Sequence, residues 1–185
     1  TETYKVNGYI NEFQVSIMES TWGGREELVD SKGIIDYVSL MRIALQRSKT
    51  AREAINVMTT LVEKYGYASS GESFSIADKN EIWIMEMIGK GTGVTGANWV
   101  AVRIPDDCIA AHANQSRIHK ISQYAKKDVL YSKDLISFAR KKGYFSGKDN
   151  EFDFANAFAP ADFGAMRFCE ARVWSFFNRF VSGME

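Results

Sequence analysis

The chain has 185 residues, 45% of them hydrophobic and 13% aromatic, and its 23 basic side chains balance its 23 acidic ones. This length and apolar content predict one globular domain over residues 1–185 and exclude a disordered chain. With no net charge and no basic run, nucleic-acid binding is not expected. No apolar run approaches the roughly 20 residues that cross a bilayer, so no membrane partner is expected either.

The first half of the chain predicts a hairpin followed by two helices. Apolar and polar residues alternate between residues 4 and 19, with a turn expected at Asn11 and Glu12. The second helix is the better defined, because Thr50 and Glu53 form a capping box and Gly66 is placed to end it. In the first helix, the expected apolar stripe is Ile34, Val38, Met41 and Leu45.

A block of strands follows, with turns at residues 77–81 and 89–96. The segment 82–87 is apolar on both alternating faces except at Glu86, so we expect this strand to be covered on both sides. His112 and Asn114 are expected at the far end of the last strand, where their side chains share a face.

Two more helices are predicted in the last third of the chain. Ser132 is expected to cap a short helix that ends at Gly143. A helix rich in Phe and Trp over residues 163–180 should pack its apolar stripe on a face of the sheet. Because helices and strands fall in blocks, the order favours an α+β fold with an antiparallel sheet.

Several polar residues are candidates for chemistry, each with a structural alternative. The Asn114 amide can donate to a developing oxyanion, or it can satisfy loop backbone. Glu19, Ser20 and Thr21 can line a pocket or cap a loop. His112 has no carboxylate cluster at ligand spacing, so no metal site is expected.

The charged residues and cysteines of the last third have structural explanations as well. Arg167 and Glu170 are spaced for an ion pair on a helix surface. Cys108 and Cys169 are interpreted as buried thiols or a single disulfide, and neither makes a convincing nucleophile–base pair with a histidine.

Eight blocks of sequence resemble one enzyme family. They are GYINEFQVSI (8–17), ESTWGGR (19–25), GIIDY (33–37), the helix pair ALQR (44–47) and TAREAI (50–55), GESFSIAD (71–78), AHANQ (111–115) and DFGAMRFCEARVW (162–174). At these residues the chain resembles the bacterial cysteine dipeptidases of the N-terminal-nucleophile hydrolase superfamily, relatives of bile-salt hydrolases and penicillin V acylases.

The resemblance implies an αββα four-layer sandwich whose nucleophile is a cysteine made N-terminal by processing. Since this chain begins Thr1-Glu2-Thr3, we expect an internal part of the catalytic domain that lacks its first strands and its nucleophile. The alternative is that Thr1 is itself the nucleophile. By the same resemblance, Asn114 helps to hold the oxyanion and Arg167 lies beside the nucleophilic sulfur.

The resemblance also implies a substrate and partners. Glu19, Ser20, Thr21, His112 and Arg172 are expected to bind a dipeptide or small amide, with no cofactor. The expected partners are the remainder of the same protein and, through an exposed sheet face, a second copy of the chain. The alternatives are another amide hydrolase of acylase or bile-salt type, and a non-catalytic binding domain.

Overall fold

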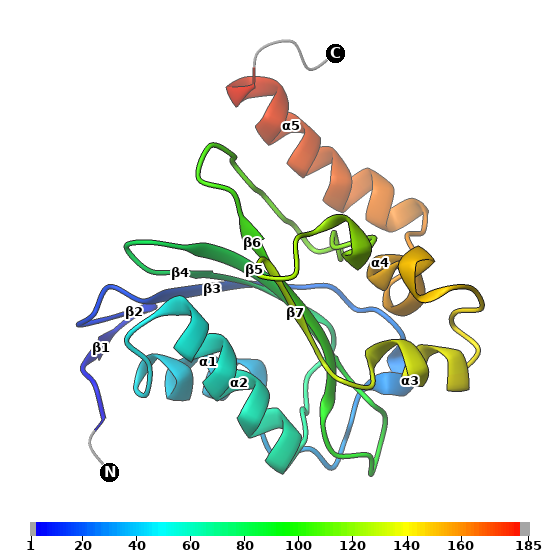
Figure 1. The fold of residues 1–185 in the computed structure, drawn as a ribbon, viewed down its shortest axis with the longest axis horizontal. Helices are drawn as coiled ribbons and strands as arrows, with labels where there is room; N and C mark the ends of the chain where they lie inside the picture. Colours follow the sequence, from blue (N-terminus) through cyan, green and yellow to red (C-terminus); the bar gives the residue numbers. More distant parts are fainter. Residues whose placement is uncertain (1–2, 182–185) are drawn as a thin grey trace.

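The computed structural model describes residues 3–181 as one twisted antiparallel sheet with helices on both faces (Figure 1). Thr1, the alternative nucleophile, lies outside these residues. The strands follow one another across the sheet in chain order, each antiparallel to the next. They are β1 (Val6–Asn7), β2 (Ile10–Asn11), β3 (Ser16–Thr21), β4 (Glu72–Ala77), β5 (Ile82–Gly89), β6 (Ala97–Ile104) and β7 (Val129–Tyr131).

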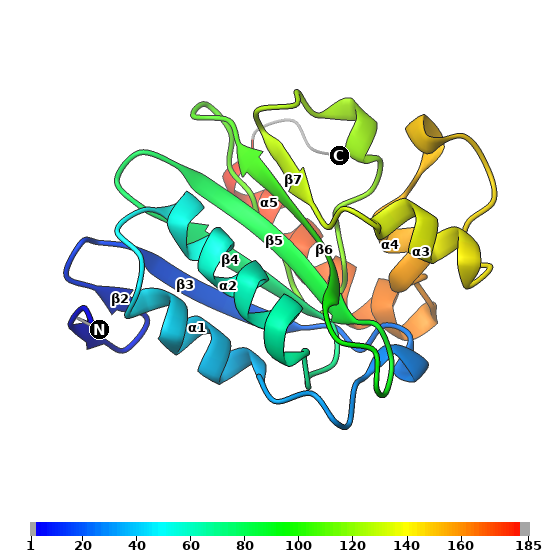
Figure 2. The same ribbon diagram turned by 60° about the horizontal axis from the view of Figure 1, so that its bottom comes forward.

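Two helices, α1 (Tyr37–Leu45) and α2 (Ala51–Tyr65), cover one face of the sheet, as Figure 2 shows. Thr50 accepts a hydrogen bond from the Glu53 amide, as the capping box predicts, but the Glu53 carboxylate reaches the amide of Lys49 and not that of Thr50. Gly66 ends α2 with a positive φ of 75°, a conformation that glycine adopts without steric cost.

Two of the four residues in the predicted apolar stripe of the first helix are not buried. Met41 and Leu45 are buried, but Ile34 precedes α1 and is 72% exposed, and Val38 also faces solvent. Asp36 caps the helix through the Ser39 amide. Because the helix begins at Tyr37, its buried face differs from the predicted stripe. It is formed by Leu40, Met41, Ala44 and Leu45.

The second face is covered by irregular chain and short helices. The remaining helical elements are η1 (Glu26–Leu28), η2 (Ile121–Gln123), α3 (Leu135–Lys141), η3 (Asp149–Glu151), α4 (Phe154–Phe158), the π-helical turn η4 (Ala165–Glu170) and α5 (Ala171–Phe180). Asp134 occupies the cap position of α3, while the Ser132 hydroxyl accepts from the Trp99 amide, so the predicted Ser132 cap is wrong.

The two faces hold separate apolar clusters, and β5 contributes to both. Met85 packs under α1 and α2, and Ile88 packs with Phe154 and Phe158 of α4. The prediction that this strand is covered on both sides is therefore confirmed, with Ile82 as its exposed first residue. The α+β class with an antiparallel sheet is confirmed as well.

Two predictions for the ends of elements are corrected. His112 and Asn114 do not end a strand, because β6 stops at Ile104 and the chain to Lys120 is irregular. The last helix does not bury its apolar stripe on the sheet. In α5 only Val173 is buried, whereas Trp174 and Phe180 are 55% and 70% exposed.

Candidate functional site

The candidate site lies where the irregular segment 105–120 crosses the face of the sheet opposite α1 and α2. Three side chains of strands β3 and β4 form its floor: Ser20, Ser73 and Ser75. Because side chains alternate along a strand, these three point to the same face in register. Short hydroxyl side chains leave room for the crossing segment and offer it hydrogen-bond partners.

His112 is held between two of these serines. Its Nδ1 lies 2.6 Å from Ser20 Oγ and its Nε2 lies 2.7 Å from Ser75 Oγ. The Ser20 hydroxyl already donates to the Ala113 carbonyl, so it accepts from Nδ1–H, and Ser75 donates to Nε2 of a neutral ring. Burial lowers the pKa of His112, in keeping with this neutral form.

Asn114 is fixed from two sides. Its Nδ2 donates to the Thr21 carbonyl at 2.5 Å, and its Oδ1 accepts from Arg172 Nη2 at 2.7 Å. Arg172 is itself anchored, because its Nε donates to the Phe168 carbonyl. One amide hydrogen of Asn114 thus remains after these contacts, and the residue is exposed to solvent.

Asn114 borders a cavity of about 710 Å³. Its lining also includes Gly23, Gly24, Arg25, Phe168 and Cys169. Gly24 has a φ of +75°, and a Cβ there would meet Trp22 and Ile88, so only glycine keeps this wall so close to the core.

The predicted substrate-binding residues divide between the two faces of the sheet. Ser20, His112 and Arg172 gather around Asn114, and Thr21 contributes its carbonyl there. Glu19, by contrast, points toward the helices, as does the Thr21 hydroxyl, which donates to Glu72. A strand that alternates faces cannot direct three consecutive side chains into one pocket.

Arg167 stands apart from this group. Its guanidinium lies 6.0 and 5.5 Å from the ring centroids of Phe163 and Phe168, and it lines none of the described cavities. The predicted Arg167–Glu170 ion pair is wrong, since Glu170 pairs with Arg117.

The cysteine prediction is also corrected. Cys108 is exposed, Cys169 is half-buried, and both are free thiols. Cys108 is therefore not the buried thiol that was expected, and the alternative of a disulfide between the two cysteines is wrong as well.

Within residues 3–181, no three His, Cys, Asp or Glu side chains gather as they do around a metal ion. None of the helices described there combines the length and apolar character that crossing a membrane requires.

Comparison with known proteins gives the family. The family model described as peptidase family C69 matches residues 1–185. The chain belongs to this family. The predicted relationship to the bacterial dipeptidases is thereby confirmed.

Curated relatives of this C69 chain carry dipeptidase names. It is 30% identical over 173 residues to a probable dipeptidase of Salmonella dublin, covering 90% of this chain and 38% of the relative. It is 31% identical over 136 residues to a probable dipeptidase of Latilactobacillus sakei, covering 74% and 27%. A probable dipeptidase B of Streptococcus pyogenes serotype M1 is 26% identical over 155 residues, covering 81% and 30%. The C69 chain thus spans well under half the length of the relatives that it matches.

Sequence reasoning missed how the crossing segment of this C69 chain is held. The fully buried Glu86 carboxylate accepts from Ser116 Oγ at 2.5 Å, from the Arg117 amide at 2.6 Å and from the Ile118 amide at 3.2 Å. Burial raises its pKa, and these hydrogen bonds oppose that effect. Glu86 was visible in the sequence as the only charge in an apolar strand, but its partners in the crossing segment are 30 or more residues away.

Proposed function

We propose that this chain is part of the catalytic domain of a dipeptidase that hydrolyses peptide bonds with a cysteine nucleophile located outside the 185 residues. The C69 family match and the names of the relatives support this proposal. The proposed substrate is a dipeptide, and the proposed chemistry passes through a tetrahedral oxyanion.

The geometry of Asn114 is the observation that carries the assignment. Hydrogen bonds to Thr21 and Arg172 fix both ends of the amide, and one N–H remains for a ligand at the edge of the 710 Å³ cavity. A donor that is already oriented costs little reorganisation when negative charge develops. We assign Asn114 to the oxyanion.

The cysteines of the chain are poorly suited to be the nucleophile. Although Cys108 is exposed, partial loss of hydration and the neighbouring Asp107 carboxylate raise its pKa, so the reactive thiolate is disfavoured. Cys169 lines the same cavity as Asn114, yet no hydrogen bond joins it to a histidine among residues 3–181.

The other site residues receive proposed roles that follow their positions. Arg172 orients Asn114, and Ser20 with His112 holds the segment that carries it. Arg167 forms no ion pair within the described residues, so its charge is available to favour a thiolate. We propose that Thr21 takes part through its backbone carbonyl, which holds Asn114, whereas the Glu19 side chain lies on the opposite face of the sheet and does not reach the Asn114 cavity.

We also propose the αββα four-layer sandwich, completed by the remainder of the protein. The relatives' greater length supports this proposal, as do the large exposed apolar side chains of the last two helical elements. Exposed apolar side chains that gather on one helix often mark an interface.

The test is dipeptide hydrolysis by the full-length protein and its Asn114→Ala variant. Losing one oxyanion donor should lower kcat by about 10²–10³ with little change in KM. Thr59→Val is a matched control, because Thr59 lies on α2 at the opposite face of the sheet. Full kcat in Asn114→Ala would disprove the oxyanion assignment.

A substrate panel distinguishes the proposed dipeptidase from its rivals. The full-length protein should cleave free dipeptides and leave acyl amides and bile-salt conjugates intact. Cleavage of acyl amides alone would favour an acylase, and binding of dipeptides without turnover would favour a binding domain.

A further inference from the structure

The lining of the Asn114 cavity includes a cation that the proposed chemistry does not use. Arg25 is the only Lys, Arg or His side chain among the described residues that line this cavity. Its Nε donates to the Ala157 carbonyl at 2.6 Å, and its guanidinium carbon lies 3.9 Å from the centre of the Tyr144 ring. These contacts fix the plane of the guanidinium. Its Nη1 lies 3.9 Å from the Glu27 carboxylate, beyond hydrogen-bond distance, so the Nη donors remain available.

Arg25 and Asn114 are tied to the same end of α4. The last carbonyls of a helix have no partner within it, and here other segments of the chain donate to them. The Arg25 amide donates to the Phe158 carbonyl at 3.1 Å, and Gln115 Nε2 donates to the Ala159 carbonyl at 2.7 Å. Because Gln115 directly follows Asn114, the oxyanion donor and the Arg25 guanidinium are held in fixed positions around one cavity.

The loop before Arg25 adds backbone donors to this part of the cavity. The amides of Gly23 and Gly24 donate to no acceptor among residues 3–181, and both glycines line the cavity. A Cβ at Gly23 would meet no atom within 4 Å, so this part of the loop faces open space. Successive backbone N–H groups in a turn form a concavity that holds anions. With the guanidinium beside them, these amides provide the donors that a single carboxylate requires.

The charges that line the cavity fit a zwitterion better than a simple anion. Glu26, Glu27 and Asp162 line the same cavity as Arg25. The Glu27 carboxylate is also engaged by the Tyr144 hydroxyl at 2.8 Å. A ligand that carries one carboxylate and one ammonium group therefore meets both signs of charge here, with Arg25 as the cation for its carboxylate. A free dipeptide is such a ligand at neutral pH.

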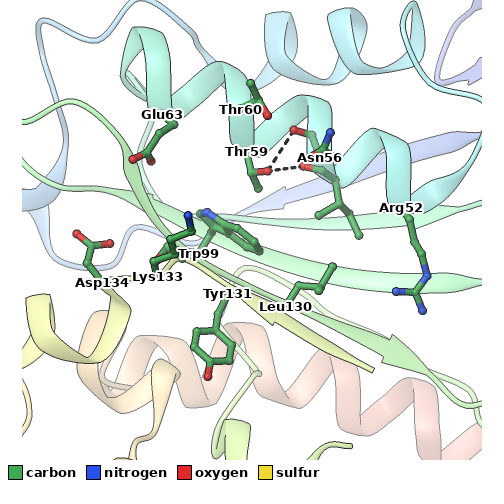
Figure 3. A pocket seen from close by; sticks show the side chains of 12 residues that line it. Arg52, Asn56, Thr59, Thr60, Glu63, Trp99, Leu130, Tyr131, Lys133 and Asp134 are labelled. Carbon is green, nitrogen blue, oxygen red and sulfur yellow. Dashed lines mark hydrogen bonds between the residues drawn. The ribbon is translucent and has the colours of Figure 1, made fainter. Parts of the chain in front are cut away.

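The arginine of the second large cavity is satisfied within the chain. This cavity measures about 750 Å³ and lies between α2 and β7, on the opposite face of the sheet, as Figure 3 shows. Its Arg52 donates from Nε to the Glu81 carboxylate at 2.8 Å and from Nη2 to the Lys127 carbonyl at 3.3 Å. Arg25 differs in that its Nη groups have no acceptor within hydrogen-bond distance among residues 3–181.

We propose that the loop of residues 23–25 binds the C-terminal carboxylate of the dipeptide, an inference that rests on the proposed dipeptidase function. One residue spans about 3.5 Å, so the carboxylate of a dipeptide lies a single residue beyond the scissile carbonyl at Asn114. In a longer peptide an uncharged peptide group takes that place and leaves the Arg25 guanidinium without its anion. Arg25 is thus a specificity residue that selects dipeptides with a free carboxylate.

The test compares three substrates of the full-length protein: a dipeptide, its C-terminal amide, and the same dipeptide extended by one C-terminal residue. The wild type should prefer the free dipeptide over both by about 10–100-fold in kcat/KM. Arg25→Gln should remove this preference by raising KM for the free dipeptide while leaving the amide nearly unchanged. Arg25→Lys, which retains the charge, should retain part of it. Lys133→Gln removes a charge from the second cavity and should leave the preference intact.

The ratio between acid and amide separates recognition from structural damage. If Arg25 only holds the loop against α4, its substitution will lower turnover of both substrates equally, and this result would overturn the inference. A wild-type protein that cleaves acid and amide equally well would overturn it too, without any variant having to fold, and the dipeptidase proposal would stand. Hydrolysis of neither substrate would contradict the dipeptidase proposal and, with it, the inference that rests on it.

Discussion

Two buried glutamates occupy neighbouring strands, point to opposite faces of the sheet, and are satisfied very differently. Glu86 accepts hydrogen bonds from Ser73, Ser116 and two backbone amides. One oxygen of Glu72 accepts a hydrogen bond from the Thr21 hydroxyl. The other is buried without a hydrogen-bond partner among the described residues, and the Glu19 carboxylate lies near it. Burial, with Glu19 adding to it, raises the pKa of Glu72 to about 8.

This shift predicts a specific dependence of stability on pH. A carboxyl group whose pKa is raised by folding keeps its proton in the folded state while the unfolded chain releases it. The stabilising contribution of Glu72 is therefore complete below its ordinary pKa of 4.5 and is lost as pH rises toward 8. In Glu72→Gln this loss should be absent, with a difference of a few kcal/mol across the window, since one pKa unit equals about 1.4 kcal/mol.

Urea unfolding of the chain between pH 4.5 and 8.5 measures the effect. The difference between the wild-type and Glu72→Gln curves isolates this group from the two histidines. Glu63→Gln, at an exposed position of α2, should parallel the wild type. Parallel curves for wild type and Glu72→Gln would show that Glu72 titrates normally.

At the scale of elements, the apolar pattern of α5 led to a wrong prediction of its surroundings. A helix rich in Phe and Trp normally packs on a sheet, but here Val173 alone is buried within α5. A periodic pattern gives the direction of an apolar face and not the identity of what covers it. The covering surface is proposed to lie in the remainder of the protein.

Substitutions on α5 test this interpretation. Replacing Trp174 and Phe180 by Ser in the isolated chain should change the free energy of unfolding by about 0.5 kcal/mol or less, because both are exposed. It should also reduce self-association seen by light scattering. Val173→Ala is the matched control and should cost about 1.6 kcal/mol, the value of two buried methyl-sized groups. Equal destabilisation by both changes would mean that α5 is packed in solution.

At the scale of the whole molecule, the two apolar clusters lie on opposite faces of the sheet. β5 has buried side chains on both faces, whereas β1 and β2 are two-residue strands at one edge. Local opening is least favourable where burial and pairing are most complete.

Amide hydrogen exchange should follow this gradient. The amides of β5 should exchange slowest, those of β4 and β6 next, and those of β1, β2 and the exposed face of α5 fastest. Mass spectrometry of peptic fragments at neutral pH measures the order. Comparable protection in β1 and β5 would contradict a core centred on the middle of the sheet.

The sequence by itself determined the features that depend on neighbours along the chain. The α2 cap at Thr50, the stop at Gly66 and the doubly covered strand 82–87 all follow from short-range geometry and alternation. The family relationship was also readable, because it rests on ordered blocks of residues. Such features need no knowledge of what lies across the fold.

Only the tertiary structure decided which of these residues meet. Asn114 finds the Thr21 carbonyl 93 positions away and Arg172 58 positions away, while Glu19 is turned to the other face by strand alternation. The exposure of α5 and the open edge of β7 likewise depend on what the rest of the fold leaves uncovered. Burial and pairing are set by packing between distant segments, and local sequence does not encode that packing.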